Sequence, residues 1–155
     1  MAIRTGDTAP AITLPSKPGE NVEVGIGSRP VVLLFMPLAF SGVCTDEMCH
    51  MRDDWSAWSS LDAEVYGIFP DSPFVTDKFR EEHQLPFPIL SDFNRDTARA
   101  WGVLHETLGD FFRDVPKRSA FVIAADGTVA YDWVTDDPKV MPPFEEVRNA
   151  IGAAV

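Results

Sequence analysis

Cysteine, histidine and long apolar runs are scarce in this chain. Its 155 residues include two cysteines and three histidines, and no Cys-x-x-Cys pair of the kind that dithiol reductants use. No apolar run approaches the ~18 residues of a membrane span, and the opening MAIRTGDTAP lacks the basic-then-apolar pattern of a secretory signal. We therefore expect no membrane partner, a cytoplasmic location and, from the length, a single domain over residues 1–155.

Positive charge is also scarce. The chain has 13 basic and 24 acidic residues, a net charge of -11. Binding to nucleic acid needs a basic patch, so we expect no nucleic-acid partner. The abundance of Asp and the small number of lysines are compatible both with a salt-rich source and with an ordinary acidic cytoplasmic protein.

The hydrophobic pattern alternates between strand and helix. The run VVLLFM at 31–36 is continuously apolar, which is typical of a strand buried on both faces of a sheet. Interleaved strands and helices followed by a hairpin predict an α/β fold with a central mixed sheet. The expected strands are 11–14, 21–24, 31–36, 64–69, 89–90, 118–124 and 129–134. The expected helices are 42–61, 75–83, 96–101 and 143 to the end.

Both cysteines lie in the segment PLAFSGVCTDEMC, residues 37–49, just after the buried strand. If the helix begins near Gly42, Cys44 lies in its first turn, where unpaired N–H groups and the helix dipole favour a thiolate. Pro37 would keep the approach to the helix rigid, and Ser41 offers a hydroxyl to a substrate oxygen or to the thiolate. An arginine would complete such a site, because it stays charged and presents several donors.

Cys49 lies five residues after Cys44. Five residues of ideal helix separate two Cα atoms by at least ~7.5 Å and turn their side chains ~140° apart. A disulfide requires Cα atoms below ~7 Å and converging side chains. If both cysteines are helical, a bond between them therefore requires the helix to unwind locally, as in a cycle in which one thiol is oxidised and the second resolves it.

The spacing Pro37-x-x-x-Ser41-x-x-Cys44 resembles the P-x-x-x-[TS]-x-x-C signature of the peroxiredoxins. CTDEMC is similar to the bacterioferritin comigratory protein (peroxiredoxin Q) type, and PLAF to the alkyl hydroperoxide reductase E type. GDTAPAITLPS, the segment around GIFPDSPF, and RSAFVIAADGTVAY extend the similarity over nearly the whole chain. The resemblance implies a thioredoxin-like fold with helices flanking the sheet and an N-terminal extension.

The resemblance also implies roles for particular residues. Cys44 would attack a peroxide and become a sulfenic acid, and Cys49 would resolve it as an intramolecular disulfide. Arg118 would steady the thiolate, Glu47 would orient Arg118, and Arg52 is a further candidate for this network. Pro37 and Ser41 match the remaining positions of the signature. The implied partners are a peroxide substrate and a thioredoxin-like protein or small-thiol reductant, with no cofactor and no metal, in a homodimer or a monomer.

Several alternatives remain open from the residues alone. Cys49 could be a bystander, with an external thiol completing the cycle of a one-cysteine peroxidase. The chain could instead be a thiol–disulfide redox sensor with little peroxide turnover. A zinc site could combine the cysteines with His50, His83 or His105, although the spacing is loose for zinc. Otherwise these histidines read as helix-face or helix-end residues. Arg113 competes with Arg118 as the cation, and the neighbouring Phe111 and Phe112 could border the site or an oligomer contact.

Overall fold

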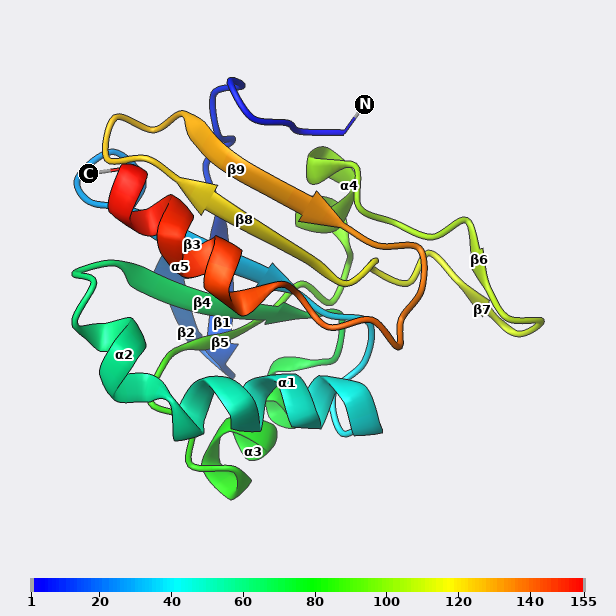
Figure 1. Ribbon diagram of the computed structural model, residues 1–155. Coiled ribbons are helices and arrows are strands. Elements are labelled where there is room, and N and C mark those ends of the chain that lie inside the picture. The colour runs from blue at the N-terminus through cyan, green and yellow to red at the C-terminus, as the bar shows by residue number, and fades with distance from the viewer. Residues whose placement is uncertain (1, 155) are drawn as a thin grey trace.

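A five-stranded mixed sheet forms the centre of the molecule in the computed structural model, which describes residues 2–154 (Figure 1). Its strand order is β5-β4-β3-β8-β9. β3 (Val31–Phe35), β4 (Glu64–Phe69) and β5 (Ile89–Ser91) are parallel to one another. β8 (Ser119–Ile123) pairs antiparallel with both β3 and β9 (Val129–Val134). The predicted α/β architecture with a central mixed sheet is therefore confirmed.

Helices cover both faces of this sheet (Figure 1). Their bounds are α1 Gly42–Asp53, α2 Trp55–Ser59, α3 Pro73–Glu82, α4 Asp96–Trp101 and α5 Phe144–Ala153. The strand at 31–36 is buried on both faces, as predicted, and successive side chains of β3 point to opposite faces. Val32 and Leu34 pack in the cluster that includes residues of α1, α2, α3 and α5. Leu33 and Phe35 pack in the cluster that includes residues of α4 and the N-terminal segment.

The N-terminal extension contains a small separate sheet. β1 (Thr13–Lys17) pairs antiparallel with β2 (Glu20–Glu23). The first strand begins two residues later than the predicted 11–14. Gly19 lies in the turn with φ +79°, a conformation that glycine adopts without steric cost. The two strands are therefore placed on either side of this glycine turn, and the apolar pattern of residues 11–14 alone does not locate them.

The helix predicted over 42–61 is broken into α1 and α2 at Asp54. Asp54 has φ -107° and ψ 21°, outside the helical region. Its carboxylate accepts a hydrogen bond from Nη1 of Arg148 on α5 at 2.7 Å. Asp is also a weak helix former, and the ion pair with α5 lies at the break.

A second short hairpin lies between residues 107 and 113, where no strand was predicted. β6 (Thr107–Leu108) pairs with β7 (Phe112–Arg113), and the hairpin projects from the body of the molecule (Figure 1). Phe111 at its tip is 83% exposed. Strands of two residues are too short to produce a recognisable alternation of apolar and polar residues, so periodicity could not predict them.

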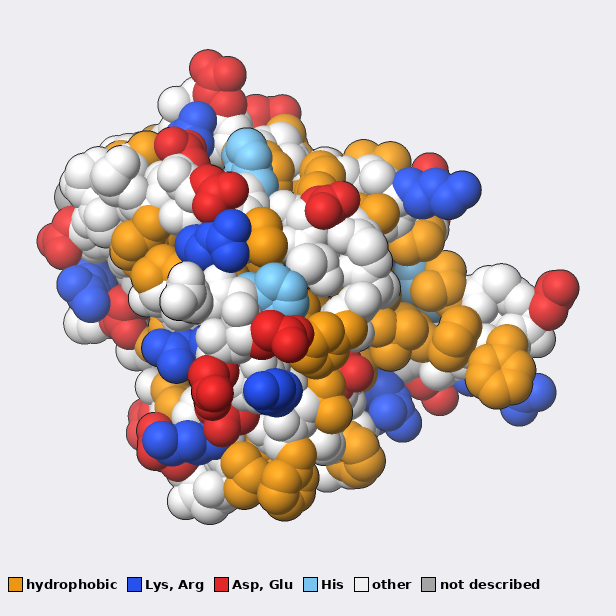
Figure 2. All heavy atoms as spheres, turned by 90° about the horizontal axis from the view of Figure 1, so that it is seen from below, with side chains coloured by type: hydrophobic (Ala, Val, Ile, Leu, Met, Phe, Trp, Pro, Cys, Tyr) orange, Lys and Arg blue, Asp and Glu red, His pale blue; other side chains and the backbone are white. Residues whose placement is uncertain are grey.

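The face formed by α1 and α3 carries acidic and basic side chains interspersed with hydrophobic groups (Figure 2). The basic side chains on this face lie mostly singly beside acidic ones and form no continuous basic surface there. None of the helices within residues 2–154 is long and apolar enough to cross a membrane.

Candidate active site

The loop between β3 and α1 is held in one conformation by contacts from other elements. Pro37, two residues after the end of β3, is buried. The backbone N–H of Ala39 donates to the Asp71 carboxylate at 2.8 Å. Phe40 has φ +66°, in the left-handed region that is costly for a bulky residue. Its ring lies edge-on to Phe79 of α3 at 5.0 Å between centroids, a contact that helps to hold the strained residue.

This loop delivers Cys44 to the first turn of α1, as predicted. Cys44 is the third residue of the helix and its side chain is fully buried. A thiolate there lies close to the positive end of the helix dipole. Cys49 lies further along the same helix, partly buried, and both thiols are free.

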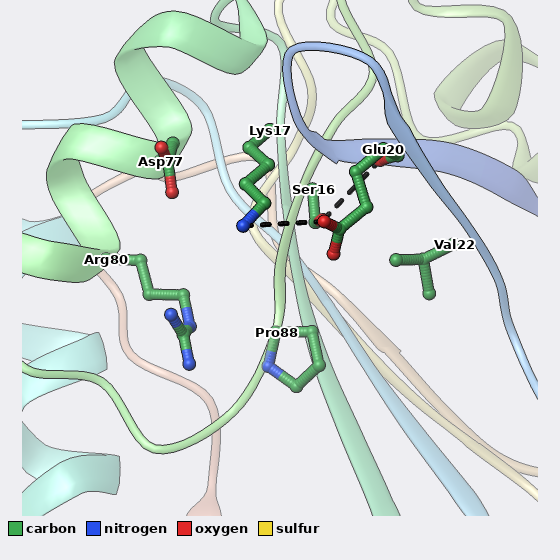
Figure 3. A pocket seen from close by; sticks show the side chains of 7 residues that line it. All are labelled: Ser16, Lys17, Glu20, Val22, Asp77, Arg80 and Pro88. Atoms are coloured by element: carbon green, nitrogen blue, oxygen red, sulfur yellow. Dashed lines mark hydrogen bonds and ion pairs between the residues drawn. The ribbon is translucent and has the colours of Figure 1, made fainter.

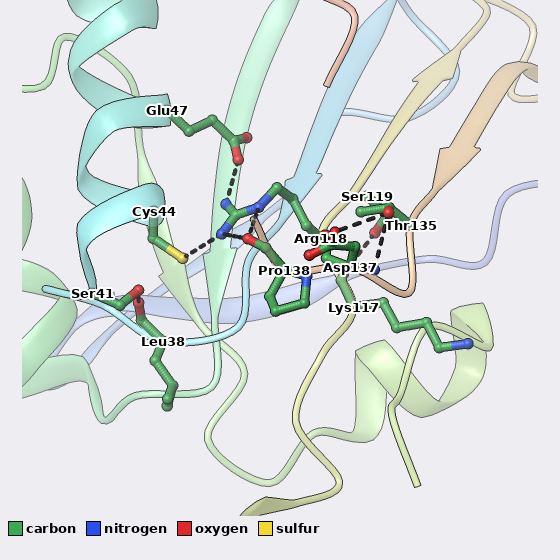
Figure 4. A network of polar contacts seen from close by, with 10 residues as sticks. All are labelled: Leu38, Ser41, Cys44, Glu47, Lys117, Arg118, Ser119, Thr135, Asp137 and Pro138. Carbon is green, nitrogen blue, oxygen red and sulfur yellow. Dashed lines mark hydrogen bonds and ion pairs between the residues drawn. The ribbon is translucent and has the colours of Figure 1, made fainter. Parts of the chain in front are cut away.

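Arg118 lies immediately before β8 and reaches Cys44 across the sheet edge (Figure 4). Its Nη2 donates to Cys44 Sγ at 3.3 Å, and its Nη1 donates to Glu47 Oε1 at 2.6 Å. All three side chains are at most 1% exposed. The structure therefore brings together three of the residues that the sequence singled out.

The backbone carbonyl of Pro138 is a further partner that sequence reasoning missed. It accepts hydrogen bonds from Nε and Nη2 of Arg118 at 3.1 and 2.9 Å (Figure 4). Arg118 is thus fixed from three directions, by a thiol, a carboxylate and a carbonyl. A backbone carbonyl in a loop leaves no mark in the side-chain pattern, so the sequence held no signal for it.

Burial and neighbouring charges shift the pKa values of this cluster in opposite directions. Burial raises the pKa of Glu47 from 4.5 to about 7, although the charge and hydrogen bond of Arg118 act in the opposite direction. Burial would lower the pKa of Arg118, but the charges of Glu47 and Cys44 outweigh it and the pKa is raised. Arg118 therefore remains a cation in an environment that excludes water.

Ser41 lies at the N-cap of α1, but its hydroxyl does not contact Cys44. Its Oγ donates to the carbonyl of Leu38 at 2.7 Å (Figure 4). The expected contact with the thiolate is therefore not made in this structure. Ser41 still lines the pocket beside Arg118.

A pocket of about 210 Å³ lies beside Arg118, while Cys44 and Glu47 are buried behind its lining. Its lining is almost entirely apolar and includes Pro37, Val43, Leu108 and Pro138 beside Arg118. Leu108 comes from the β6–β7 hairpin, which therefore borders the site. Phe112 of the same hairpin lies in a neighbouring pocket with Leu38. Neither Phe111 nor Phe112 lines the pocket beside Arg118, so their place at the site or at an oligomer contact stays a prediction.

The other two arginines considered lie outside the cluster. Arg52 donates Nε to Asp53 at 3.0 Å and Nη1 to the carbonyl of His83 at 2.9 Å. Arg113 is exposed on β7. Neither hydrogen bonds to Cys44 or Glu47, so Arg118 is the cation of this site.

The histidines occupy three unrelated environments. His50 is on the exposed face of α1 and stacks on Phe144 of α5 at 4.3 Å. His83 caps the end of α3, as expected. His105 is not a helix-end residue. It is buried after α4, and its backbone N–H donates to the carbonyl of Val115. Within residues 2–154, no three Cys, His, Asp or Glu side chains gather as a metal ion would require.

A second pocket, of about 200 Å³, lies between the β1–β2 hairpin and α3 (Figure 3). Two basic residues, Lys17 and Arg80, and two acidic residues, Glu20 and Asp77, line it. Lys17 Nζ lies 3.4 Å from Glu20 Oε2. The charges balance, so this pocket has no net charge to attract an ion.

Comparison with known proteins agrees with the geometry. The profile of the AhpC/TSA family matches residues 5–132. The chain is 34% identical over 136 residues to peroxiredoxin Bcp of Bacillus subtilis, covering 86% of each protein. It is 33% identical over 128 residues to chloroplastic peroxiredoxin Q of Gentiana triflora, covering 82% of this chain and 57% of that protein.

The fold agrees as well. The crystal structure of peroxidoxin BcpB from Mycobacterium tuberculosis superposes with a TM-score of 0.85 at 29% identity, covering 99% of both chains. The thioredoxin-like fold that the sequence resemblance implied is therefore confirmed. The chain belongs to the AhpC/TSA family and is an enzyme of the peroxiredoxin type.

Proposed function

We propose that this chain reduces hydrogen peroxide and organic hydroperoxides with Cys44 as the attacking thiolate. The observation that carries this proposal is the 3.3 Å contact between Arg118 Nη2 and Cys44 Sγ in a fully buried site at the start of α1. A buried cation beside the sulfur favours the thiolate, which is the nucleophilic form of cysteine. Pro37, Ser41 and Val43 would line the approach of the peroxide.

In the first step, the Cys44 thiolate attacks one oxygen of ROOH. The S–O bond forms as the O–O bond breaks, giving a sulfenic acid and RO⁻, which is protonated to ROH. Cys44 is oxidised and the peroxide is reduced. Arg118 would stabilise the charge that moves from sulfur to the leaving oxygen, and preorganised donors of this kind act strongly where water is excluded. The role proposed for Glu47 here is to hold Arg118 in place, through the 2.6 Å contact.

In the second step, Cys49 attacks the sulfenic sulfur. A disulfide forms and water leaves, so the atoms balance without a cofactor. Cys44 and Cys49 both lie on α1, and five residues of helix hold two side chains too far apart for a disulfide. Part of α1 must therefore unwind before resolution, and it re-forms after reduction.

The disulfide then needs an external reductant, and we propose a thioredoxin-like protein or a small thiol. Two free cysteines five residues apart suit a reducing compartment such as the cytoplasm. For the assembly we propose a homodimer or a monomer. The exposed Phe111 on the projecting hairpin is the feature that favours a dimer.

Two other cycles fit the same cluster: a one-cysteine peroxidase that uses an external thiol, and a redox sensor with little turnover. Variants of the two cysteines distinguish them when peroxide consumption is followed with an external thiol reductant. Cys44→Ser should abolish consumption. Cys49→Ser should complete one turnover and then stall unless another thiol reduces the sulfenic acid directly. Sustained turnover by Cys49→Ser would indicate the one-cysteine cycle, and little turnover by the wild type would indicate the sensor.

A further inference from the structure

The guanidinium of Arg118 hydrogen bonds to two acidic groups in the buried cluster. Arg118 donates to Cys44 with Nη2 and to Glu47 with Nη1, and all three side chains are at most 1% exposed. If both the thiol and the carboxyl were ionised, the cluster would carry a net negative charge without contact with water. Burying an uncompensated charge is strongly unfavourable, and buried groups avoid it by taking up a proton.

The surroundings of Glu47 agree with a protonated carboxyl. Its Oε1 accepts from Arg118, but its Oε2 is buried and has no hydrogen-bond partner among the described residues. Arg118, immediately before β8, is the charged group that acts on the carboxyl, and Cys44, three residues earlier on α1, shares that arginine. Burial raises the pKa of Glu47 to about 7 despite the arginine.

The charge of the cluster changes when Cys44 is oxidised. A sulfenic acid is neutral, so the positive charge of Arg118 is then left for Glu47 alone. In the reduced cluster, the charges of Arg118 and the Cys44 thiolate cancel when Glu47 is protonated. In the oxidised cluster, the charge of Arg118 is cancelled when Glu47 is ionised. A Cys44 thiol beside an ionised Glu47 would also be neutral, but only the thiolate attacks peroxide. In the reacting form the proton is therefore on Glu47, and electroneutrality favours its loss when Cys44 is oxidised.

We infer that Glu47 is protonated in the reduced enzyme and ionises as Cys44 is oxidised, so that the proton it releases balances the one taken up by the leaving alkoxide. This inference rests on the proposed peroxidase function. The step is Cys44–S⁻ + ROOH → Cys44–SOH + RO⁻, with RO⁻ + H⁺ → ROH and Glu47–COOH → Glu47–COO⁻ + H⁺. The sum takes no proton from the solution. Glu47 acts here through the charge of Arg118 and does not touch the peroxide.

Proton counting tests this inference. Reduced protein is mixed at pH 6 with one equivalent of hydrogen peroxide in weakly buffered solution containing a pH indicator, and remaining peroxide is measured in parallel. Wild-type protein should take up no net proton. Glu47→Gln keeps an oxygen that can accept from Arg118 but has no proton to release, so it should take up one proton per molecule oxidised.

Glu64→Gln is the matched control. Glu64 is also paired with an arginine, with Oε2 3.4 Å from Arg29 Nε, but its side chain is 23% exposed and lies at the start of β4. Glu64→Gln should take up no net proton on oxidation, as the wild type should. A second readout needs no variant: the infrared carbonyl stretch of a protonated carboxyl should be present in the reduced wild type and lost on oxidation.

The possible outcomes separate this inference from the peroxidase itself. Equal proton uptake by the wild type and Glu47→Gln, with peroxide consumed by both, would overturn the role of Glu47 and leave the peroxidase intact. Absence of the carboxyl band in the reduced wild type would overturn it as well. If the wild type consumed no peroxide, the proposed function and this inference would both fall.

Discussion

Nη2 of Arg118 lies 3.3 Å from the sulfur of Cys44, while Nη1 of the same guanidinium lies 2.6 Å from Glu47. Residues 74 and 71 positions away in the sequence thus meet one side chain at the edge of the sheet. The antiparallel pairing of β3 with β8 creates this meeting, because Phe35 at the end of β3 lies opposite Ser119, next to Arg118. The contact between Arg118 and Cys44 therefore depends on the register of these two strands.

Replacing Arg118 should slow the reaction with peroxide much more than it alters the fold. Removal of one preorganised donor at a reacting centre typically costs about 10²–10³-fold in rate. We expect a loss of this order for Arg118→Ala in the second-order rate constant for hydrogen peroxide, measured by stopped flow. Arg118→Lys should retain part of the rate, because it keeps the charge but loses the planar fork.

Two controls accompany the arginine variants. Removing one partner of a buried ion pair also destabilises the protein, by about 3–5 kcal/mol, so rates must be compared for protein shown to be folded by circular dichroism. Arg113→Ala, at an exposed position on β7, should react as the wild type does. A rate for Arg118→Ala within a factor of two of the wild type would exclude the proposed role of this arginine.

Glu47 should make the folded state less stable as the pH rises. Its pKa is about 7 when folded, above the value of 4.5 expected when it is exposed. Between these values the folded state binds more protons than the unfolded state, so the free energy of unfolding falls as the pH increases from 4.5 to 7. Glu47→Gln removes this contribution, and its stability should fall less over the same interval.

Urea denaturation at several pH values measures this difference. Asp71 and Asp92 also have pKa values raised by burial, but they are present in both proteins and cancel in the comparison. Parallel pH profiles for the wild type and Glu47→Gln would show that the carboxyl of Glu47 is already ionised in the folded protein.

The contact between Arg148 and Asp54, at the break between α1 and α2, should contribute modestly to stability. Arg148 Nη1 donates to Asp54 at 2.7 Å, and its guanidinium lies 5.5 Å from the centre of the Trp58 ring. Both charged side chains are partly exposed, so we expect Arg148→Ala to lower the free energy of unfolding by roughly 1 kcal/mol. Arg99→Ala, which removes a more exposed pair with Asp96, should have a smaller effect in the same urea titration.

The sequence predicted the elements that have a strong period and clear boundaries. The buried run at 31–36, the strand at 64–69 and the helix at 96–101 were confirmed because apolar spacing and turn residues agree there. The apolar spacing of 42–61 did not predict the break at Asp54, and the contact of Asp54 with Arg148, 94 residues away, is visible only in the structure. Helix and strand periodicity describes a segment by itself and contains no information about such distant partners.

The same distinction between local pattern and distant partners applies to the site. Cys44, Cys49, Pro37 and Ser41 could be found because they lie in one short segment with a recognisable spacing. Arg118 and Glu47 depended on the family resemblance, and only the structure shows that one guanidinium contacts both Glu47 and the sulfur. The carbonyl of Pro138 and the hydrogen bond from Ser41 to Leu38 involve backbone atoms, which carry no residue-specific signal.

The most direct test is the mass of the protein after a single oxidation. Reduced protein receives one equivalent of hydrogen peroxide, is quenched with an alkylating agent, and its intact mass is measured. The two-cysteine mechanism predicts a loss of two hydrogens and no alkylation, with the disulfide mapped to Cys44 and Cys49. One added oxygen on Cys44 with Cys49 alkylated would contradict resolution by Cys49. Two alkylated thiols and unconsumed peroxide would contradict the peroxidase mechanism as a whole.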